Sequence, residues 1–544
     1  MSAARTPWRL RRAEDLAGLG AREWDLVVVG GGITGAGIAW QAARHGLGTL
    51  LLEARDWAGG TSSRSSKLVH GGLRYLPRGE ISLVRQVGRE REALERLWPH
   101  LVRPLPFLIP DYRGRSMPLS LLGAGVWAYD RLTGVPPEHR RRMLRPRDVQ
   151  VLESGLRRQG LLGGVRYFEA RTDDARLVYA VVQAARAAGC TALSRVRVAE
   201  MRLRDGRGEL EAVDVETGQS LGLAARAVVN ATGPWVSEVD PEGPRMALGR
   251  GCHLVFARES LPLRHAVALP APDGANTFAV PRHRVTYVGT TDRICEGDPA
   301  LPDVPDEDVS YLLDLLAYTF PEAHLGPRDL LAVYAGVRPL VAREGSGETR
   351  ELSRRQEVDV RRDGLISVRG GKLTGFRGMA QEVLDRLRRA GLPVGAAPDD
   401  EAPAPMLGDE AFAASHQLRA EALAEIVERH GAKTPELLRY AAERRDGLRP
   451  VADGASLTWG EVDWAAEFEE VCHLSDLLIR RTALLWFGGL REPEAVLRPV
   501  AERIAPTLGW SPERVDAEVG DCRRQAHLDR LAELRGEGPT FGPR

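Results

Sequence analysis

Residues 67–76, KLVHGGLRYL, place an ammonium, an imidazole, a guanidinium and a phenol around a pair of glycines. The imidazole of His70 has an intrinsic pKa suited to proton transfer near neutral pH. The guanidinium of Arg74 can bind an anion through paired hydrogen bonds, and Tyr75 adds a phenolic hydroxyl. Because a lone histidine is more often a hydrogen-bonded structural residue, the pattern must be interpreted together with the elements around it.

A glycine-rich loop precedes this stretch. Gly30, Gly32 and Gly35 form G-x-G-x-x-G directly after an apolar strand, and Glu53 lies at the end of the next strand. The glycines permit a tight turn and close approach of the backbone to a pyrophosphate, whose charge lies at a helix N-terminus. Glu53 would accept hydrogen bonds from the ribose hydroxyls. Together these features predict a dinucleotide-binding loop, although the spacing does not separate NAD from FAD.

The residues after the second strand favour FAD. The sequence GGTSSRSSKLVHGG, residues 59–72, offers hydroxyls and glycines where an extended flavin would continue toward its ring. For Lys67 a structural role is an equal alternative. We expect cofactor contacts here from Thr61, Ser62, Ser63, Ser66, Lys67 and Leu68.

The elements that must position these residues can be followed along the chain. Residues 25–29 and 48–54 read as buried strands, with a helix between them from about residue 34 to 45, which makes a βαβ unit. A helix over 176–189 precedes a further strand that runs into a Gly-Pro turn. From about residue 408 the pattern is almost entirely helical, with helix starts at Thr434 and Ser511.

Composition excludes several classes of protein. The 544 residues carry 75 Lys+Arg and 75 Asp+Glu, so no net basic field exists to hold a nucleic acid. The five cysteines are widely spread and form no CxxC pair, which argues against a disulfide framework and against a structural zinc site. We therefore expect no metal and a reducing compartment.

Targeting and membrane signals are few. The first residues are basic but lack the apolar core of a signal peptide, so we expect a cytoplasmic protein. No uncharged run approaches the roughly 18–20 residues of a membrane-spanning helix. Residues 116–129, SMPLSLLGAGVWAY, could form a buried core segment or lie in a membrane surface. Residues 477–489, LLIRRTALLWFGG, could be core packing or a membrane-facing patch.

Lysine is rare in this chain. Only Lys67, Lys372 and Lys433 are lysines, while arginine is abundant. A lysine is a compact point charge whose pKa can be lowered, which arginine cannot replace. The lysine in GGKLTGFR, residues 370–377, therefore indicates a specific task.

Six ordered motifs carry a family resemblance. DLVVVGGGITGAGIAWQAARHG, TSSRSSKLVHGGLRYL, VVNATGPWV, VGTTD, AGVRPL and GGKLTGFR resemble the FAD-dependent glycerol-3-phosphate dehydrogenases of aerobic bacteria over roughly residues 24–390. The resemblance implies an α/β fold: a Rossmann-like FAD-binding domain of the D-amino-acid-oxidase type, an inserted, mostly antiparallel substrate domain and an α-helical C-terminal domain.

The resemblance also suggests domain limits. The FAD-binding domain would comprise residues 24–105, 171–245 and 331–393. The substrate domain would comprise 106–170 and 246–330. A linker rich in Pro, Ala and Asp over 394–407 would lead to the helical domain, 408–544.

The implied activity is oxidation of sn-glycerol 3-phosphate to dihydroxyacetone phosphate, with electrons passing through FAD to membrane quinone. The enzyme would be peripheral on the inner face of the cell membrane, and a homodimer is one assembly that it could form. One alternative is a glycerol-3-phosphate oxidase that uses oxygen and produces peroxide, and another is a non-catalytic flavin-binding interaction protein. An enzyme acting on an RNA-bound substrate is disfavoured by the neutral net charge.

The resemblance assigns site residues by motif position. His70 would be the base at the flavin face, with His253 in GRGCHLVF as the rival. Thr232 and Gly233 would form a second flavin-contacting turn, with a helix start as the alternative. The substrate phosphate and oxygens would be held by Arg74, Tyr75, Arg338, Arg354 and Lys372, of which Arg338 and Lys372 would also serve catalysis. Further cofactor contacts would come from Gly371, Lys372, Leu373 and Thr374.

One departure affects this assignment. Gly375 and Phe376 stand where family members often carry threonine and tyrosine, which puts a hydroxyl contact near the flavin in doubt.

Overall fold

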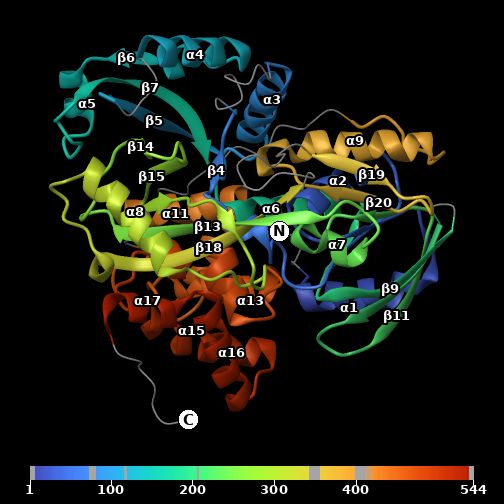
Figure 1. Ribbon diagram of the computed structural model, residues 1–544. Helices are drawn as coiled ribbons and strands as arrows, with labels where there is room; N and C mark the ends of the chain where they lie inside the picture. The colour runs from blue at the N-terminus through green and yellow to red at the C-terminus, as the bar shows by residue number, and fades with distance from the viewer. Residues whose placement is uncertain are drawn as a thin grey trace.

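The computed structural model describes residues 6–72, 81–114, 119–204, 207–341, 356–398, 412, 414, 416 and 418–537. Their arrangement confirms the expected fold class: a sheet flanked by helices, a larger and mostly antiparallel sheet, and a helical C-terminal domain beneath both (Figure 1). Arg74, Tyr75 and Arg354 lie outside the described residues.

A six-stranded sheet carries the dinucleotide loop. Its strands, in spatial order, are β19 (Glu357–Val360), β20 (Ile366–Arg369), β12 (Val228–Asn230), β2 (Leu26–Val29), β3 (Thr49–Glu53) and β8 (Thr191–Ser194). All neighbouring pairs are parallel except β19 with β20. The βαβ unit predicted from the sequence is therefore confirmed, with β2 and β3 paired in parallel around α2 (Ile33–Arg44).

Both faces of this sheet are covered, which explains why β2 and β3 are apolar at every central position. Leu26, Val28 and Leu51 pack against helices α2, α6 (Asp174–Ala187) and α9 (Phe376–Arg389). Val27 and Leu50, on the opposite face, pack against a smaller four-stranded sheet. That sheet consists of β1 (Glu23–Trp24), β11 (Ser220–Ala225), β10 (Arg207–Asp214) and β9 (Val196–Arg204).

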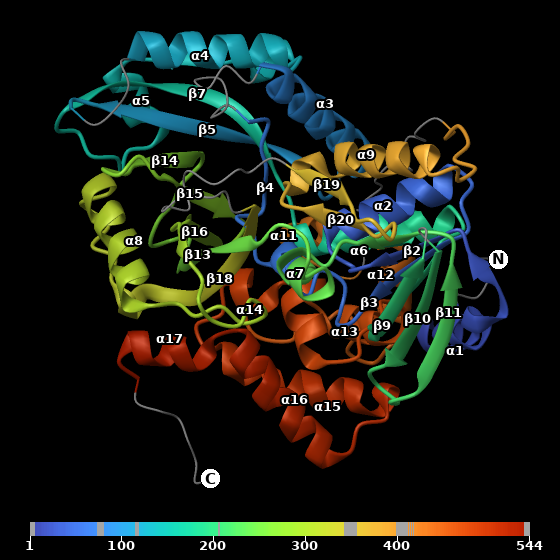
Figure 2. The same cartoon turned by 45° about the vertical axis from the view of Figure 1, so that its right-hand side comes forward.

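The second large sheet of the molecule has ten strands and is antiparallel except between β14 and β5. Helices α3 (Ile81–Leu97), α4 (Leu119–Leu132), α5 (Pro146–Leu152), α7 (Val236–Val239) and α8 (Asp306–Thr319) complete these domains (Figure 2). The strands are β4 (Leu68–Val69), β5 (Arg103–Tyr112), β6 (Arg142–Leu144), β7 (Leu161–Arg171), β13 (Met246–Ala257), β14 (Ala266–Pro270), β15 (Asn276–Arg282), β16 (Val285–Gly289), β17 (Arg293–Ile294) and β18 (Leu330–Val341).

The last return of the chain to the FAD-binding domain comes later than residue 331. Strand β18 pairs with β13 along nearly its whole length and so belongs to the larger sheet. The chain re-enters the six-stranded sheet only at β19. Sequence pattern did not reveal this, because a buried strand has the same apolar character in either sheet.

The C-terminal part is helical, as expected. Thr434 begins α12, and the Ser511 side chain accepts a hydrogen bond from the N–H of Arg514 at the start of α16. The helices are α11 (Ala420–His430), α12 (Thr434–Ala442), α13 (Trp459–Phe468), the π-helix η9 (Asp476–Arg481), α14 (Leu484–Phe487), α15 (Leu497–Leu508), α16 (Pro512–Gln525) and α17 (Leu528–Arg535).

Residues 477–489 belong to the core of the molecule. Leu477, Leu478 and Trp486 are buried in the main hydrophobic cluster. Arg480 and Arg481 are buried as well, and both make ion pairs with Asp56. The membrane-facing alternative for this stretch is therefore wrong, because its arginines neutralise an internal carboxylate.

An N-terminal helix, α1 (Trp8–Gly18), joins two domains. The indole of Trp8 donates to the carbonyl of Ala466, and Arg9 donates to the carbonyl of Leu508. Arg12 binds Asp214 of the FAD-binding domain at 2.8 Å. The residues ahead of the dinucleotide fingerprint thus fasten the helical domain to the rest of the chain.

His473 provides a pH-dependent contact at the same domain junction. Its Nδ1 lies 2.8 Å from Glu518 and its Nε2 lies 3.3 Å from Glu216. Burial opposes the charged imidazole, but the hydrogen bonds to these carboxylates outweigh burial and raise the pKa of His473 to about 9.

We therefore expect stability to decline in mildly alkaline solution. A pKa above the unfolded value of about 6.5 means that the native state alone keeps the proton between those two values. The contribution of His473 is complete below pH 6.5 and falls until pH reaches about 9. Denaturant unfolding at several pH values would measure this slope, and His473→Gln should flatten it. An unchanged slope in that variant would contradict the assignment.

Candidate active site

Two positions of the glycine loop have room only for glycine. Gly30 has a φ of 113°, and a Cβ on it would lie 2.5 Å from the carbonyl oxygen of Ala231. A Cβ on Gly35 would lie 1.8 Å from the carbonyl oxygen of Gly30. The N-terminus of α2 follows directly, with the N–H of Ile33 bonded to Ser62 Oγ at 3.1 Å. This is the close-packed turn that a pyrophosphate requires.

Glu53 closes β3 beside this loop. Its Oε2 accepts the N–H of Gly31 at 2.6 Å, and its Oε1 accepts the N–H of Arg55 at 2.7 Å. Burial raises the pKa of Glu53, and the two backbone hydrogen bonds oppose that rise. Each carboxylate oxygen keeps a second lone pair that can accept from a ribose hydroxyl.

A cavity of about 1060 Å³ begins at this loop and extends to the larger sheet. This volume is much larger than a small substrate needs. The cavity is lined both by the glycine loop and by the later motifs around residues 338 and 372. The predicted site residues that line it are Gly30, Gly32, Glu53, Thr61, Ser62, Ser66, Leu68, His70, Thr232, Gly233, His253, Arg338, Gly371, Lys372, Leu373 and Thr374.

Gly35, Ser63 and Lys67 do not line the cavity. Gly35 acts through the shape of the turn. Lys67 is buried, and its Nζ donates to the carbonyl of Ser63 at 2.8 Å and to the carboxylate of Asp174. The structural alternative for Lys67 accounts for its position, because its ammonium fixes the chain between the loop and α6.

His253 reaches the cavity from β13. Its ring stacks on Tyr334 with centroids 4.5 Å apart, and its Nε2 lies 2.9 Å from Ser66 Oγ. Its Nδ1 is buried and has no hydrogen-bond partner among the described residues. Burial and the nearby charges of Arg338 and Lys67 lower the pKa of His253 well below its usual value. The imidazole is therefore neutral at neutral pH, and the lowered pKa makes it a weaker base than a free imidazole.

Arg338 also lines the cavity, and it lies on β18, the strand paired with the His253 strand β13. Its Nη2 donates to Thr290 Oγ1 at 2.9 Å, and its Nη1 lies 3.2 Å from Asp292 Oδ1. The VGTTD motif thus supplies the residues that orient this guanidinium. No role was predicted for Thr290 or Asp292 of this motif, because nothing local in the sequence pairs them with Arg338.

Two sections of the chain match family profiles. Residues 25–386 match the family described as FAD dependent oxidoreductase, and residues 402–515 match the C-terminal domain of alpha-glycerophosphate oxidase. An aerobic glycerol-3-phosphate dehydrogenase of Staphylococcus haemolyticus is 34% identical over 520 residues, which is 90% of this chain and 92% of that protein. The chain belongs to the FAD-dependent glycerol-3-phosphate dehydrogenase family.

Other members of the family agree with this assignment. The aerobic glycerol-3-phosphate dehydrogenase of Bacillus subtilis is 39% identical over 385 residues, covering 70% of this chain and 69% of that protein. The solved glycerol-3-phosphate dehydrogenase of Bacillus halodurans, complexed with FAD, is 30% identical and covers 98% of this chain and 99% of that chain, with a TM-score of 0.75. The L-alpha-glycerophosphate oxidase of Mycoplasma pneumoniae shares the fold at 18% identity, covering 68% of this chain and 95% of that chain, with a TM-score of 0.55.

FAD is the cofactor of this glycerol-3-phosphate dehydrogenase family member. The turn around Gly30, the start of α2 and the carboxylate of Glu53 would hold the dinucleotide, and the rest of the cavity has room for the flavin. The residues present therefore fit the group.

We expect Glu53→Ala to weaken FAD retention. The substitution removes a charge-assisted acceptor worth roughly 1.5–3 kcal/mol, which corresponds to about a 10- to 100-fold higher dissociation constant. It also leaves the N–H of Gly31 without its acceptor. The FAD-to-protein ratio after desalting measures the effect. Glu209→Ala, at an exposed carboxylate of the same domain, is the matched control, and equal FAD content in both variants would contradict the role of Glu53.

Proposed function

We propose that the protein oxidises sn-glycerol 3-phosphate to dihydroxyacetone phosphate and passes the electrons through FAD to a membrane quinone. One observation carries the proposal: the cavity that starts at the glycine loop is also lined by two histidines and two cations, His70, His253, Arg338 and Lys372. A base and a cationic anchor are what a phosphorylated secondary alcohol requires. The names of the relatives supply the substrate class.

Each of these side chains has a distinct task. FAD, when bound, accepts the hydride that leaves carbon 2 of the alcohol. His70 or His253 removes the hydroxyl proton, and the neutral imidazole of His253 has its Nδ1 available in the buried wall. Arg338 and Lys372 bind the phosphate and the developing carbonyl oxygen, together with Arg74, Tyr75 and Arg354 from segments outside the described residues.

An anaerobic titration tests this function. We expect glycerol 3-phosphate, but not glycerol, to bleach the flavin absorbance of the holoenzyme. A quinone analogue should then restore the absorbance much faster than oxygen does. Rapid reoxidation by oxygen with release of peroxide would establish the oxidase instead. A flavin that stays oxidised in the presence of glycerol 3-phosphate would contradict both enzymes and leave the non-catalytic flavin protein.

A membrane quinone requires contact with a membrane. Among the described residues, no helix combines the length and the apolar composition that crossing a bilayer requires. Peripheral attachment at the inner face of the cell membrane is therefore the form of contact that we propose. The described part of residues 116–129 begins at 119 and lies in α4, whose Leu121 and Trp127 are 57% and 51% exposed.

The surroundings of α4 support an anionic lipid surface as its partner. Strand β6 and helix α5 lie at the same end of the molecule, away from α15–α17 (Figures 1 and 2). They add the exposed side chains of Met143 and Val151. Exposed arginines in this region make no ion pair within the described part of the chain: Arg131, Arg140, Arg142, Arg145, Arg147 and Arg158. Apolar side chains among unpaired cations suit the interface of an anionic membrane.

We expect Leu121→Ser combined with Trp127→Ser to reduce binding to vesicles of phosphatidylglycerol and phosphatidylcholine by about tenfold or more, because two inserting side chains are lost. Flotation of the holoenzyme with these vesicles measures the bound fraction. Val215→Ser with Val360→Ser removes two equally exposed apolar side chains from elsewhere and is the control. Equal flotation of the two double variants would contradict the assignment of α4.

A further inference from the structure

The loop after β3, residues 54–60, packs against the glycine loop at Gly31. The N–H of Ala58 donates to the carbonyl of Gly31 at 3.1 Å. The indole of Trp57 packs so closely on Gly31 that a Cβ there would lie 2.6 Å from the ring. The N–H of Gly31 is bound by Glu53. Residues 53–58 therefore hold Gly31, which lies between the first two glycines of the fingerprint.

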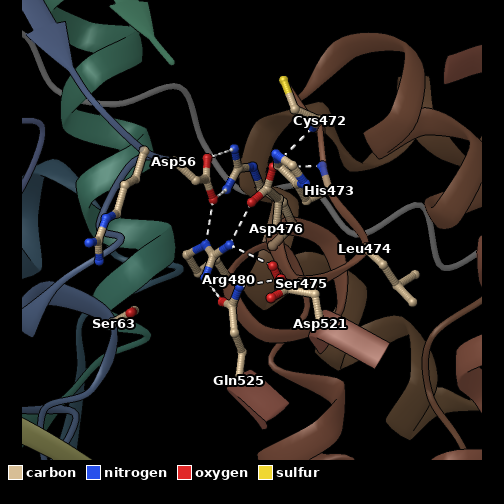
Figure 3. A network of polar contacts seen from close by, with 12 residues as sticks. Asp56, Ser63, Cys472, His473, Leu474, Ser475, Asp476, Arg480, Asp521 and Gln525 are labelled. Carbon is tan, nitrogen blue, oxygen red and sulfur yellow. Dashed lines mark hydrogen bonds and ion pairs between the residues drawn. The ribbon is translucent and has the colours of Figure 1, made fainter. Parts of the chain in front are cut away.

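The other side of this loop is held by the helical C-terminal domain (Figure 3). Asp56 is 1% exposed, and its carboxylate accepts Arg480 Nε at 2.6 Å and Arg481 Nη1 and Nη2 at 2.9 and 2.7 Å. The indole N–H of Trp57 donates to Glu470 Oε2 at 2.7 Å. Three charged side chains of the helical domain therefore determine where two consecutive loop residues lie.

The arginines are themselves fixed within the helical domain. Arg480 Nη2 binds Asp476, and Arg481 Nε donates to the carbonyl of Glu469 at 2.8 Å. These ion pairs hold Asp56 at a fixed position relative to the helical domain, because separating it from its arginines would leave buried charges without a partner and without water. If the helical domain moves, residues 54–60 must move with it, and Gly31 must move with residues 54–60.

We propose that the helical C-terminal domain sets the affinity for FAD by positioning the glycine loop through Asp56 and Trp57. Neither side chain lines the cavity, so both are positioning residues. The proposal depends on the FAD cofactor and is independent of the substrate and of the electron acceptor, so it extends beyond the proposed function.

The rival explanation is that these contacts only add general stability, and the chain offers matched controls for it. Glu428 on α11 accepts Arg171 Nη1 and Nη2, both at 2.8 Å, and so joins the same helical domain to β7 through a buried ion pair. Trp8 donates its indole N–H to the carbonyl of Ala466 in that domain. Glu428, Arg171 and Trp8 do not line the cavity, and within the described part of the chain they make no hydrogen bond or ion pair with residues 54–60.

The first test compares Asp56→Asn with Glu428→Gln. Holoenzyme is diluted, and the rise in fluorescence of released FAD gives the dissociation constant, while thermal unfolding gives Tm. Both substitutions break a buried ion pair, so both should lower Tm. We expect Asp56→Asn to raise the FAD dissociation constant about tenfold or more, and Glu428→Gln to change it by less than about twofold.

The second test leaves the ion pairs between Asp56 and its two arginines in place. Trp57→Phe keeps an aromatic ring at this position and removes the hydrogen bond to Glu470 together with part of the indole. Trp8→Phe makes the same change at the control position. We expect about a threefold or greater loss of FAD affinity in Trp57→Phe and none in Trp8→Phe, even if Asp56→Asn does not fold. Wild-type FAD affinity in folded Trp57→Phe would overturn the proposal, as would an equal loss in the Trp8→Phe or Glu428→Gln control.

Discussion

Replacing Arg338 by alanine is expected to reduce kcat/KM for glycerol 3-phosphate by about 30- to 1000-fold. The substitution removes a charge-assisted contact to a dianion, costing roughly 2–4 kcal/mol in transition-state binding. It also removes the guanidinium that lies 3.2 Å from Asp292, a carboxylate in the same wall. Repulsion between Asp292 and the phosphate would place the loss toward the upper end of the range. Arg354→Ala is expected to show a loss of the same order.

The kinetic pattern identifies the phosphate as the cause. Because the phosphate is remote from the reacting carbon, part of the loss should appear in KM and part in kcat through poorer positioning. Glycerol should be a very poor substrate for the wild type, and Arg338→Ala should oxidise it almost as the wild type does. Arg328→Ala, at an exposed arginine outside the cavity, serves as the control. If flavin-loaded Arg338→Ala oxidises glycerol 3-phosphate within about threefold of the wild type, Arg338 is not a phosphate ligand.

The second large effect is expected for Gly35→Ala, which should abolish FAD retention. The added Cβ would lie 1.8 Å from the carbonyl oxygen of Gly30, far closer than non-bonded heavy atoms can approach. Gly30 cannot simply retreat, because its N–H is bound to the carbonyl of Leu52 at 2.8 Å. Relieving the overlap must open the turn, at a cost of about 3 kcal/mol or more. The ratio of flavin to protein absorbance and the Tm both report the change.

Gly125→Ala is the matched control for this substitution. Gly125 lies inside helix α4, and an added Cβ there meets no atom within 4 Å. Alanine should raise the free energy of unfolding by about 0.5–1 kcal/mol at such a helical position and leave FAD binding unchanged. Full flavin content in Gly35→Ala would show that the turn adapts, and the steric argument for the fingerprint would then fail.

Local patterns predicted the parts of the fold that depend on local sequence. The βαβ unit, the turn at Gly30 and the starts of α12 and α16 follow from periodicity and capping, and the structure has all of them. The βαβ unit and the glycine pattern could be predicted because each depends on residues close together in the chain.

Contacts between distant residues could not be predicted in this way. Lys67 pairs with Asp174, which is 107 residues away, and no pattern in either segment names the other. The same holds for the arginines in residues 477–489: a cation beside apolar residues looks alike whether it faces lipid or a buried aspartate. Only the fold, which brings Asp56 to Arg480 and Arg481, decides between these alternatives.

The pairing of Asp56 with Arg480 also has a consequence for the order of synthesis. The two residues are 424 positions apart, so the dinucleotide fingerprint leaves the ribosome long before the side chains that brace it. Helix α1 must likewise wait for Ala466 and Leu508. Although domains commonly fold as they emerge, this flavin site becomes complete only after Arg480 and Arg481 have been synthesised. A chain that ends before these residues would lack the contacts that hold the nucleotide loop and helix α1. Both segments would then be open to proteolysis.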